Sequence, residues 1–225
     1  MKEQLQKDFE NTIRNLSLSQ KDIEIKKFSL DNFINKGFPN RREEDWKFSD
    51  LNQIINKNIG ELSFYNDYTS TNKVDTSVFV DGLVHNKIVF INGRIEKIDF
   101  DYEKKDQIEI IDQSEIINKF ENNNSLSDLN SAFTNKSFKI VVKKGYQLSK
   151  PLIIYHTTNS KIWSKNINLR LDFELQEDSS LRLIDLFNDT SEKNFLNIFY
   201  NFDLHFLLNQ NLSLIHISEP TRHDQ

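Results

Sequence analysis

The chain has 225 residues, of which 28% are charged and 37% are hydrophobic, and its formal net charge is −5. These values suit a globular protein with one large domain or two small ones. The acidic balance, with no block of basic residues, argues against nucleic acid as a partner. Because the sequence contains no cysteine, it forms no disulfide and holds no iron–sulfur cluster through thiolates.

Signals for a membrane or for secretion are missing from the sequence. No window approaches about 18 consecutive apolar residues, so we expect no membrane-spanning helix. The segment that ends at Leu16 lacks the apolar stretch of a secretory signal. We therefore expect a cytoplasmic protein that contacts no membrane.

Residues 1–75 are expected to form a helical region followed by a linker. The first helix is predicted by apolar residues at helical spacing, namely Leu5, Phe9, Ile13 and Leu16. A second helix is predicted from Ser29 to Lys36, because Gly37 is a natural helix terminator. Ser49 is expected to cap a short third helix. Residues 57–75 are polar and poorly periodic, which indicates a linker or loop.

The segment between the second and third helices mixes charges with aromatic residues. Arg41, Arg42 and Trp46 could contact a partner. The alternative, which we favour, is structural: Trp46 and Phe48 anchor a connector while the charged side chains stay in water.

Residues 76–135 are expected to be a mixed strand and helix lead-in. The dipeptides Asp81-Gly82 and Asn92-Gly93 lie between apolar runs and predict two hairpin turns. A strand is predicted near Ile108–Ile111. A helix is predicted to start with apolar residues at Ile116, Ile117 and Phe120.

A change of period marks the start of the region from 136 to 212. Before it, Leu126, Leu129 and Phe133 predict a short helix that Ser125 or Ser127 caps. After it, apolar residues alternate with lysines in the pattern of a half-buried strand. Pro151 opens the next apolar run.

The apolar runs of residues 136–212 repeat. Their centres lie near positions 140, 153, 172, 184 and 203, so that alternate centres recur at a nearly constant spacing. A repeat of this length, built of strand and turn without a long helix, predicts a β-solenoid whose units must stack to bury their apolar faces. The alternative is an antiparallel meander or sandwich with coincidental spacing.

Three motifs follow one another along the chain. They are Pro39–Phe48, with a basic residue before Trp-Lys-aromatic; Val89–Arg94, an apolar strand ending in Asn-Gly; and Leu129–Phe133 followed by Lys150–Ile153. In this order they resemble the SufB/SufD family of iron–sulfur cluster assembly proteins, and its SufD branch most. The resemblance covers about residues 20 to 211.

The resemblance implies a mainly β fold with an N-terminal helical region, in which a right-handed parallel β-helix is incomplete at the C-terminus. It implies a noncatalytic subunit, not an enzyme, of a SufBCD-type complex that builds iron–sulfur clusters. Its partners would be a SufB-like protein and the ATPase SufC, in a hetero-oligomer when the chain is full length. The cluster would be the product of the complex, and SufC would use the ATP. The family's C-terminal SufC-binding region is not matched, so no site residue is transferred.

The sequence indicates no catalytic, cofactor-binding or metal-binding residue. The sequence has histidines at His85, His156, His205, His216 and His223, and none of them lies in a metal-binding motif. We expect His156 and His205, which end or interrupt apolar strands, to be packed or rim residues. No glycine-rich phosphate loop is present. Asp172, Asp185 and Asp203 hold similar places in successive strands. They would form a carboxylate row in a polysaccharide-active β-helix, or face water in a purely structural one.

Residues 213–225, SLIHISEPTRHDQ, resemble translated adapter sequence at the end of a gene fragment. We expect them to be a non-native tail on a truncated protein. The repeat would also allow a strand to begin between Leu212 and Ile217.

Overall fold

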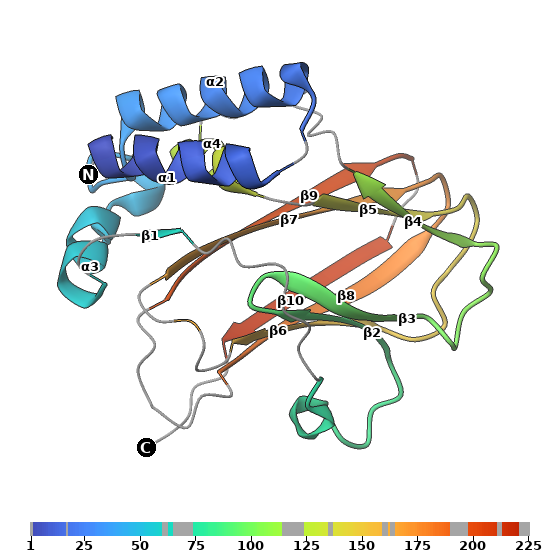
Figure 1. The fold of residues 1–225 in the computed structure, drawn as a ribbon. Helices are drawn as coiled ribbons and strands as arrows, with labels where there is room; N and C mark the ends of the chain where they lie inside the picture. The colour runs from blue at the N-terminus through green and yellow to red at the C-terminus, as the bar shows by residue number, and fades with distance from the viewer. Residues whose placement is uncertain are drawn as a thin grey trace.

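The computed structural model describes residues 2–16, 18–59, 63–64, 74–113, 124–134, 137–158, 162, 165–189, 198–210 and 213–220. Within these ranges it contains four α-helices, two short 3-10 helices and ten strands. The protein is therefore a mixed α/β protein with a helical N-terminus. Figure 1 shows the α-helices on one side of two facing sheets.

The first two helices are α1 (Lys2–Asn15) and α2 (Gln20–Lys36). The prediction of α1 is confirmed, but α2 begins well before the predicted Ser29. Its start is a capping box, in which Ser19 and Asp22 each accept a hydrogen bond from the other's backbone N–H. The predicted end at Gly37 is confirmed, with φ at +74°.

The third helix, α3 (Leu51–Asn58), was also predicted, but its N-cap is Asp50 rather than Ser49. The 3-10 helix η1 (Glu44–Trp46) precedes it. Trp46 packs on the helical core, as expected. Phe48 is 89% exposed, so the prediction that it anchors the connector is wrong.

The helices enclose a core of their own, which also takes in the strand β1 (Ser63–Phe64) and the helix α4 (Ser125–Phe133). The ring of Phe64 stacks on that of Phe133, with centroids 3.5 Å apart. The prediction that residues 57–75 are a linker or loop is therefore wrong at β1, because Ser63 and Phe64 pair with residues 165 and 166 of a later strand. The buried apolar members of this core are Leu5, Phe9, Leu30, Phe33, Phe38, Leu51, Ile55, Phe64, Leu129, Ala132 and Phe133.

The lead-in region contains β2 (Asn86–Ile91), β3 (Arg94–Asp99) and β4 (Ile108–Gln113). The hairpin through Asn92-Gly93 is confirmed, and both turn residues have positive φ, as a type I′ turn requires. The hairpin predicted at Asp81-Gly82 is wrong. The first strand of that hairpin is replaced by the 3-10 helix η2 (Thr76–Val78). Phe79, which follows η2, packs against residues of β2 such as Val89 and Ile91.

The predicted strand near Ile108 is confirmed by β4. The helix predicted from Ile116 lies outside the described residues.

All five strands predicted in the repeat region are present. They are β5 (Ser137–Val142), β6 (Leu152–Thr158), β7 (Lys165–Leu175), β8 (Ser180–Asp189) and β9 (Phe199–Leu208), and β10 (Ser213–Pro220) follows. Successive strands alternate between two sheets. Sheet A contains β4, β5, β7 and β9 in that order, with β1 also paired to β7; sheet B has the order β3, β2, β6, β8, β10.

The register of the repeat strands is regular and parallel. Lys139 pairs with Asp172, and Asp172 pairs with His205, so that one constant step along the chain relates β5 to β7 and β7 to β9. In sheet B, Leu152 pairs with Leu183 at a closely similar step. The alternative of an antiparallel meander is therefore wrong, because the antiparallel pairs among the described strands are β2 with β3 and β4 with β5.

The turns that lead from sheet A to sheet B also bond to each other. The N–H of Gly145 donates to the carbonyl of Glu177 at 2.8 Å, and that of Asp178 donates to the carbonyl of Gln210 at 3.2 Å. Gly145 and Asp178 both have positive φ, so the two turns hold the same unusual backbone conformation. The hydrogen bonding of each sheet thus continues around the corner.

The second core fills the space between the sheets. It is formed by alternate residues of facing strands, such as Ile154, Leu171 and Leu183. Helix α4 covers the outer face of sheet A, while residues 74–79 pack on the outer face of sheet B. Among the described helices, none combines the length and apolar character that a membrane crossing needs.

Residues 213–220 form strand β10, which pairs with β8 in parallel along its whole length. The structure therefore contains the strand that the repeat allowed to begin between Leu212 and Ile217. The non-native origin of the segment stays a prediction.

Candidate functional site

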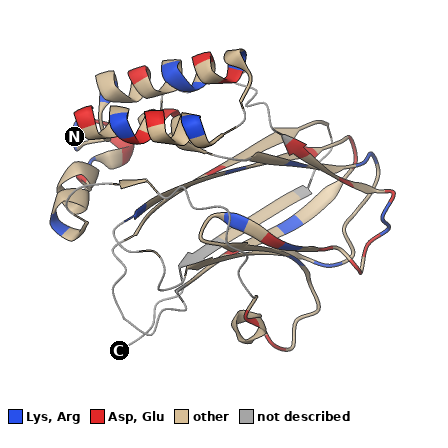
Figure 2. Ribbon diagram, in the orientation of Figure 1, with Lys and Arg blue, Asp and Glu red and all other residues tan. Residues whose placement is uncertain are grey.

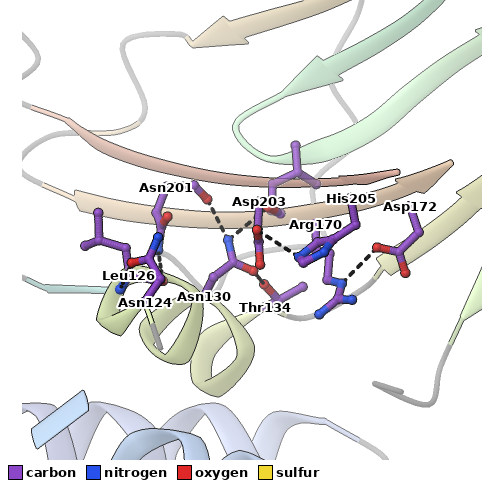
Figure 3. A network of polar contacts seen from close by, with 10 residues as sticks. Asn124, Leu126, Asn130, Thr134, Arg170, Asp172, Asn201, Asp203 and His205 are labelled. Carbon is purple, nitrogen blue, oxygen red and sulfur yellow. Dashed lines mark hydrogen bonds and ion pairs between the residues drawn. The ribbon is translucent and has the colours of Figure 1, made fainter. Parts of the chain in front are cut away.

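Helix α4 joins the helical region to sheet A, and the motif Leu129–Phe133 forms its buried half. The helix begins at Asn124, whose side chain accepts from the N–H of Leu126 at 2.9 Å. The predicted caps, Ser125 and Ser127, instead lie inside its first turn. Figure 3 shows α4 against the strands that it contacts.

Asn130 fastens α4 to two neighbouring strands. Its Nδ2 donates to the carbonyl of Leu169 in β7 at 2.9 Å and to that of Asn201 in β9 at 2.8 Å. Its Oδ1 accepts from the hydroxyl of Thr134 at 2.6 Å. The side chain is fully buried, so all of these bonds form away from bulk water.

A row of asparagines continues this polar layer beneath α4. Asn201 donates to the side chain of Asn168 at 3.0 Å. It also donates to the carbonyl of Leu126 at 2.9 Å (Figure 3). Asn168 in turn donates to Asn166. This row of asparagines was not predicted from the sequence. Its signal was the recurrence of asparagine at 168 and 201, which are register partners in neighbouring strands.

Lys26 holds the other side of α4. Its Nζ lies 2.7 Å from the carbonyl of Thr134, 3.1 Å from that of Ser131 and 3.5 Å from that of Ala132. The side chain of Lys26 is fully buried. Burial lowers the pKa of Lys26 to about 7.

The charged face of sheet A lies beyond the end of α4. Arg170 contacts Asp172 at 3.0 Å, and His205 contacts Asp203 at 3.0 Å (Figure 3). In the register Arg170 lies opposite Asp203, and Asp172 lies opposite His205. Acidic and basic side chains therefore alternate both along and across these strands, which is a stabilising arrangement for neighbouring strands. Figure 2 shows further charges concentrated on the helices and at the turns.

The three aspartates do not form the carboxylate row that a polysaccharide-active β-helix would need. Asp172 and Asp203 lie on sheet A, but Asp185 belongs to β8 of sheet B and points into the core between the sheets. It is 2% exposed, so it is not an outward-facing residue either. The three carboxylates do not converge on a common position.

Asp185 belongs to a polar centre inside the core. His156 Nε2 lies 3.4 Å from Asp185 Oδ1, and Tyr200 contacts His156 Nδ1 at 3.0 Å. The imidazole is stacked between Phe90 and Phe187, its register partners on both sides. Burial lowers the pKa of His156, which favours the neutral ring. We infer that this histidine is a packed residue, as predicted.

Of the remaining histidines, His85 makes its contacts away from this centre, whereas His216 joins it. His85 lies 2.8 Å from the hydroxyl of Tyr155 and 2.6 Å from the carbonyl of Leu83, and so holds the segment before β2 on sheet B. His216 contacts the second carboxylate oxygen of Asp185. In the part of the chain that the structure describes, no three His, Asp or Glu side chains come together in a metal-binding group. His223 lies outside the described residues.

No family model matches the chain, and no curated protein matches it.

Proposed function

We propose that the chain is a noncatalytic subunit of a SufBCD-type complex for iron–sulfur cluster assembly, and that residues 136–212 are part of a right-handed parallel β-helix. The observation that carries the proposal is the alternation of successive strands between two parallel ladders. The constant register steps and the bonded turns at Gly145 and Asp178 support the same architecture. A solenoid of this kind presents long strand edges on which another β-helix can dock.

The positions of the family-like motifs support a role in assembly rather than catalysis. Leu129–Phe133 is the buried junction between helices and sheet, and Val89–Arg94 forms β2 and its turn. Lys150–Ile153 leads into β6. Each of these motifs is explained by packing and hydrogen bonds. The polysaccharide-active alternative loses its main support, because Asp172, Asp185 and Asp203 do not form a row.

The partners follow from this proposal. We expect a SufB-like protein to pair with the strand region. The ATPase SufC is not expected to bind residues 1–212, because nothing in that sequence matches the family's SufC-binding region.

Co-purification tests the proposal. The tagged chain is co-expressed with a SufB-like and a SufC-like protein, and the eluted complex is measured by native mass spectrometry. We expect a complex with the SufB-like protein, and we expect SufC only when SufB brings it. The exposed variant Phe48→Ser is a control for nonspecific capture through a fully accessible aromatic side chain. A folded chain that captures no SufB-like protein, or that binds SufC directly through residues 1–212, would contradict the proposal.

A further inference from the structure

One buried amine, that of Lys26, lies in the contact between α2 and α4. Ser131 and Ala132 belong to the last turn of α4, where backbone carbonyls lack partners within the helix. Lys26 Nζ supplies donors to them and to Thr134, the residue that ends the helix. Because Asn130 fastens α4 to β7 and β9, this amine connects the N-terminal helices to sheet A.

The two carboxylates nearest to Lys26 along α2 and α4, those of Asp22 and Asp128, each have another partner. On its own helix Asp22, one turn earlier, acts on the amine through its charge, but its carboxylate also accepts from the Ser19 hydroxyl at 2.6 Å. On α4, Asp128 pairs with Lys36 at 2.9 Å. Among the described residues, no carboxylate is in contact with the Lys26 amine. A neutral amine still has two N–H groups, which match the two shorter contacts, to Thr134 and Ser131.

We propose that the protonation state of Lys26 controls the docking of α2 on α4. The two helices stay docked while the amine is neutral, and uptake of a proton by Nζ weakens their contact. This device does not depend on the assembly function proposed above. It would let the attachment of the helical region to sheet A respond to pH in the physiological range.

The direction of the response follows from proton linkage. The docked state holds Lys26 with its pKa lowered to about 7, whereas the released helix exposes it to water at the ordinary value of 10.5. Between these values the released state binds more protons, so docking becomes more favourable as the pH rises. The change approaches about tenfold per pH unit. Carboxyl groups ordinarily titrate near pH 4 and do not contribute in this range.

The absence of cysteine from the sequence allows a local test. Ser29→Cys places a single thiol on α2, one turn after Lys26, at a position that is 3% exposed. Thr157→Cys, in a second protein, places it in β6 at a position that is 5% exposed. The labelling rate of each native thiol, divided by its rate in urea at the same pH, gives an opening constant. It is measured from about pH 7.5 to about pH 9.5, above the ordinary pKa of histidine.

We expect the opening constant of Ser29→Cys to fall severalfold or more per pH unit, while that of Thr157→Cys stays level. Adding Lys26→Met to Ser29→Cys should remove the slope. An opening constant at Ser29→Cys that does not change with pH would overturn the proposal. So would an equal fall at both positions, because α2 would then not open separately. Neither outcome requires the Lys26→Met variant to fold.

Discussion

The side chain of Asn130 donates to the carbonyl oxygen of Asn201 at 2.8 Å, although the two residues are far apart in the sequence. Through this bond, and its companion to Leu169, a single amide joins α4 to two parallel strands (Figure 3). The junction between the helical region and the sheets therefore depends on a hydrogen-bonded asparagine as well as on apolar packing.

Replacing this amide tests its importance. Asn130→Leu should lower the free energy of unfolding by about 2–3 kcal/mol, because it leaves buried backbone carbonyls and the Thr134 hydroxyl without their partner. Urea denaturation gives the value. The matched control is Asn56→Leu, at an exposed position of α3, which should change stability by less than about 0.5 kcal/mol. If the two substitutions lowered the free energy of unfolding equally, the hydrogen bonds of Asn130 would not be what stabilises the junction.

Gly93 is expected to tolerate no side chain. Its φ is +78°, and an added Cβ would lie 2.5 Å from Cγ2 of Ile167, a buried residue of β7. Gly93→Ala should therefore cost about 2 kcal/mol or more. Gly82→Ala is the control, because Gly82 has φ of +74° with no described atom within 4 Å of the added carbon, and it should cost only about 1 kcal/mol. Thermal denaturation compares them, and the same loss for both would rule out the Ile167 contact.

Asp178 holds a conformation that glycine adopts more easily. Its φ is +59°, and Gly145 has φ of +72° at the matching place in the neighbouring turn. Asp178→Gly should raise the free energy of unfolding by about 0.5 kcal/mol, and Gly145→Asp should lower it by about as much. Chemical denaturation of both variants measures these shifts. A loss of stability in Asp178→Gly would mean that the aspartate side chain matters more than the backbone.

The ionisation of Glu103 is expected to make the free energy of unfolding depend on pH in the acidic range. Burial alone raises the pKa of Glu103, but donors from Asn86, Tyr146 and the backbone of Ser149 and Lys150 outweigh it and keep this pKa below the ordinary value. The unfolded chain thus binds the proton more tightly. The stabilisation is present above the ordinary glutamate pKa of about 4.3 and is lost as the pH falls through the lower folded value.

The Glu103→Gln variant isolates this effect. Its free energy of unfolding should be lower than that of the unmodified chain near neutral pH, and the difference should shrink on acidification. A difference that stays constant down to about pH 3 would show that the carboxylate is not the titrating group.

Much of the strand region was predictable from the sequence, because alternation of apolar residues and turn dipeptides report local geometry. The repeat strands and the Asn92-Gly93 hairpin are confirmed for this reason. The direction of Asp185 was not predictable. Ile184 and Asp185 are adjacent, so the period of two does not decide which one faces the core until the neighbouring strands fix the register.

Lys26 was missed for a related reason. A lysine within a helix is ordinarily exposed, and only the arrival of α4, much later in the chain, gives its amine carbonyl partners. Strand β1 likewise is too short for a periodic pattern, and its pairing with β7 comes from tertiary contact. The polar contacts of the junction are therefore set by the fold rather than by local sequence.

One long sequencing read through the native gene, across the codon for Leu212, tests the central claim most directly. We expect the reading frame to continue with a different sequence in place of 213–225, and the further strands to keep the spacing seen from β5 to β9. We also expect genes for a SufB-like protein and a SufC-like ATPase beside this gene. A frame that stops after Gln225, with no such neighbours, would contradict the assignment to iron–sulfur cluster assembly.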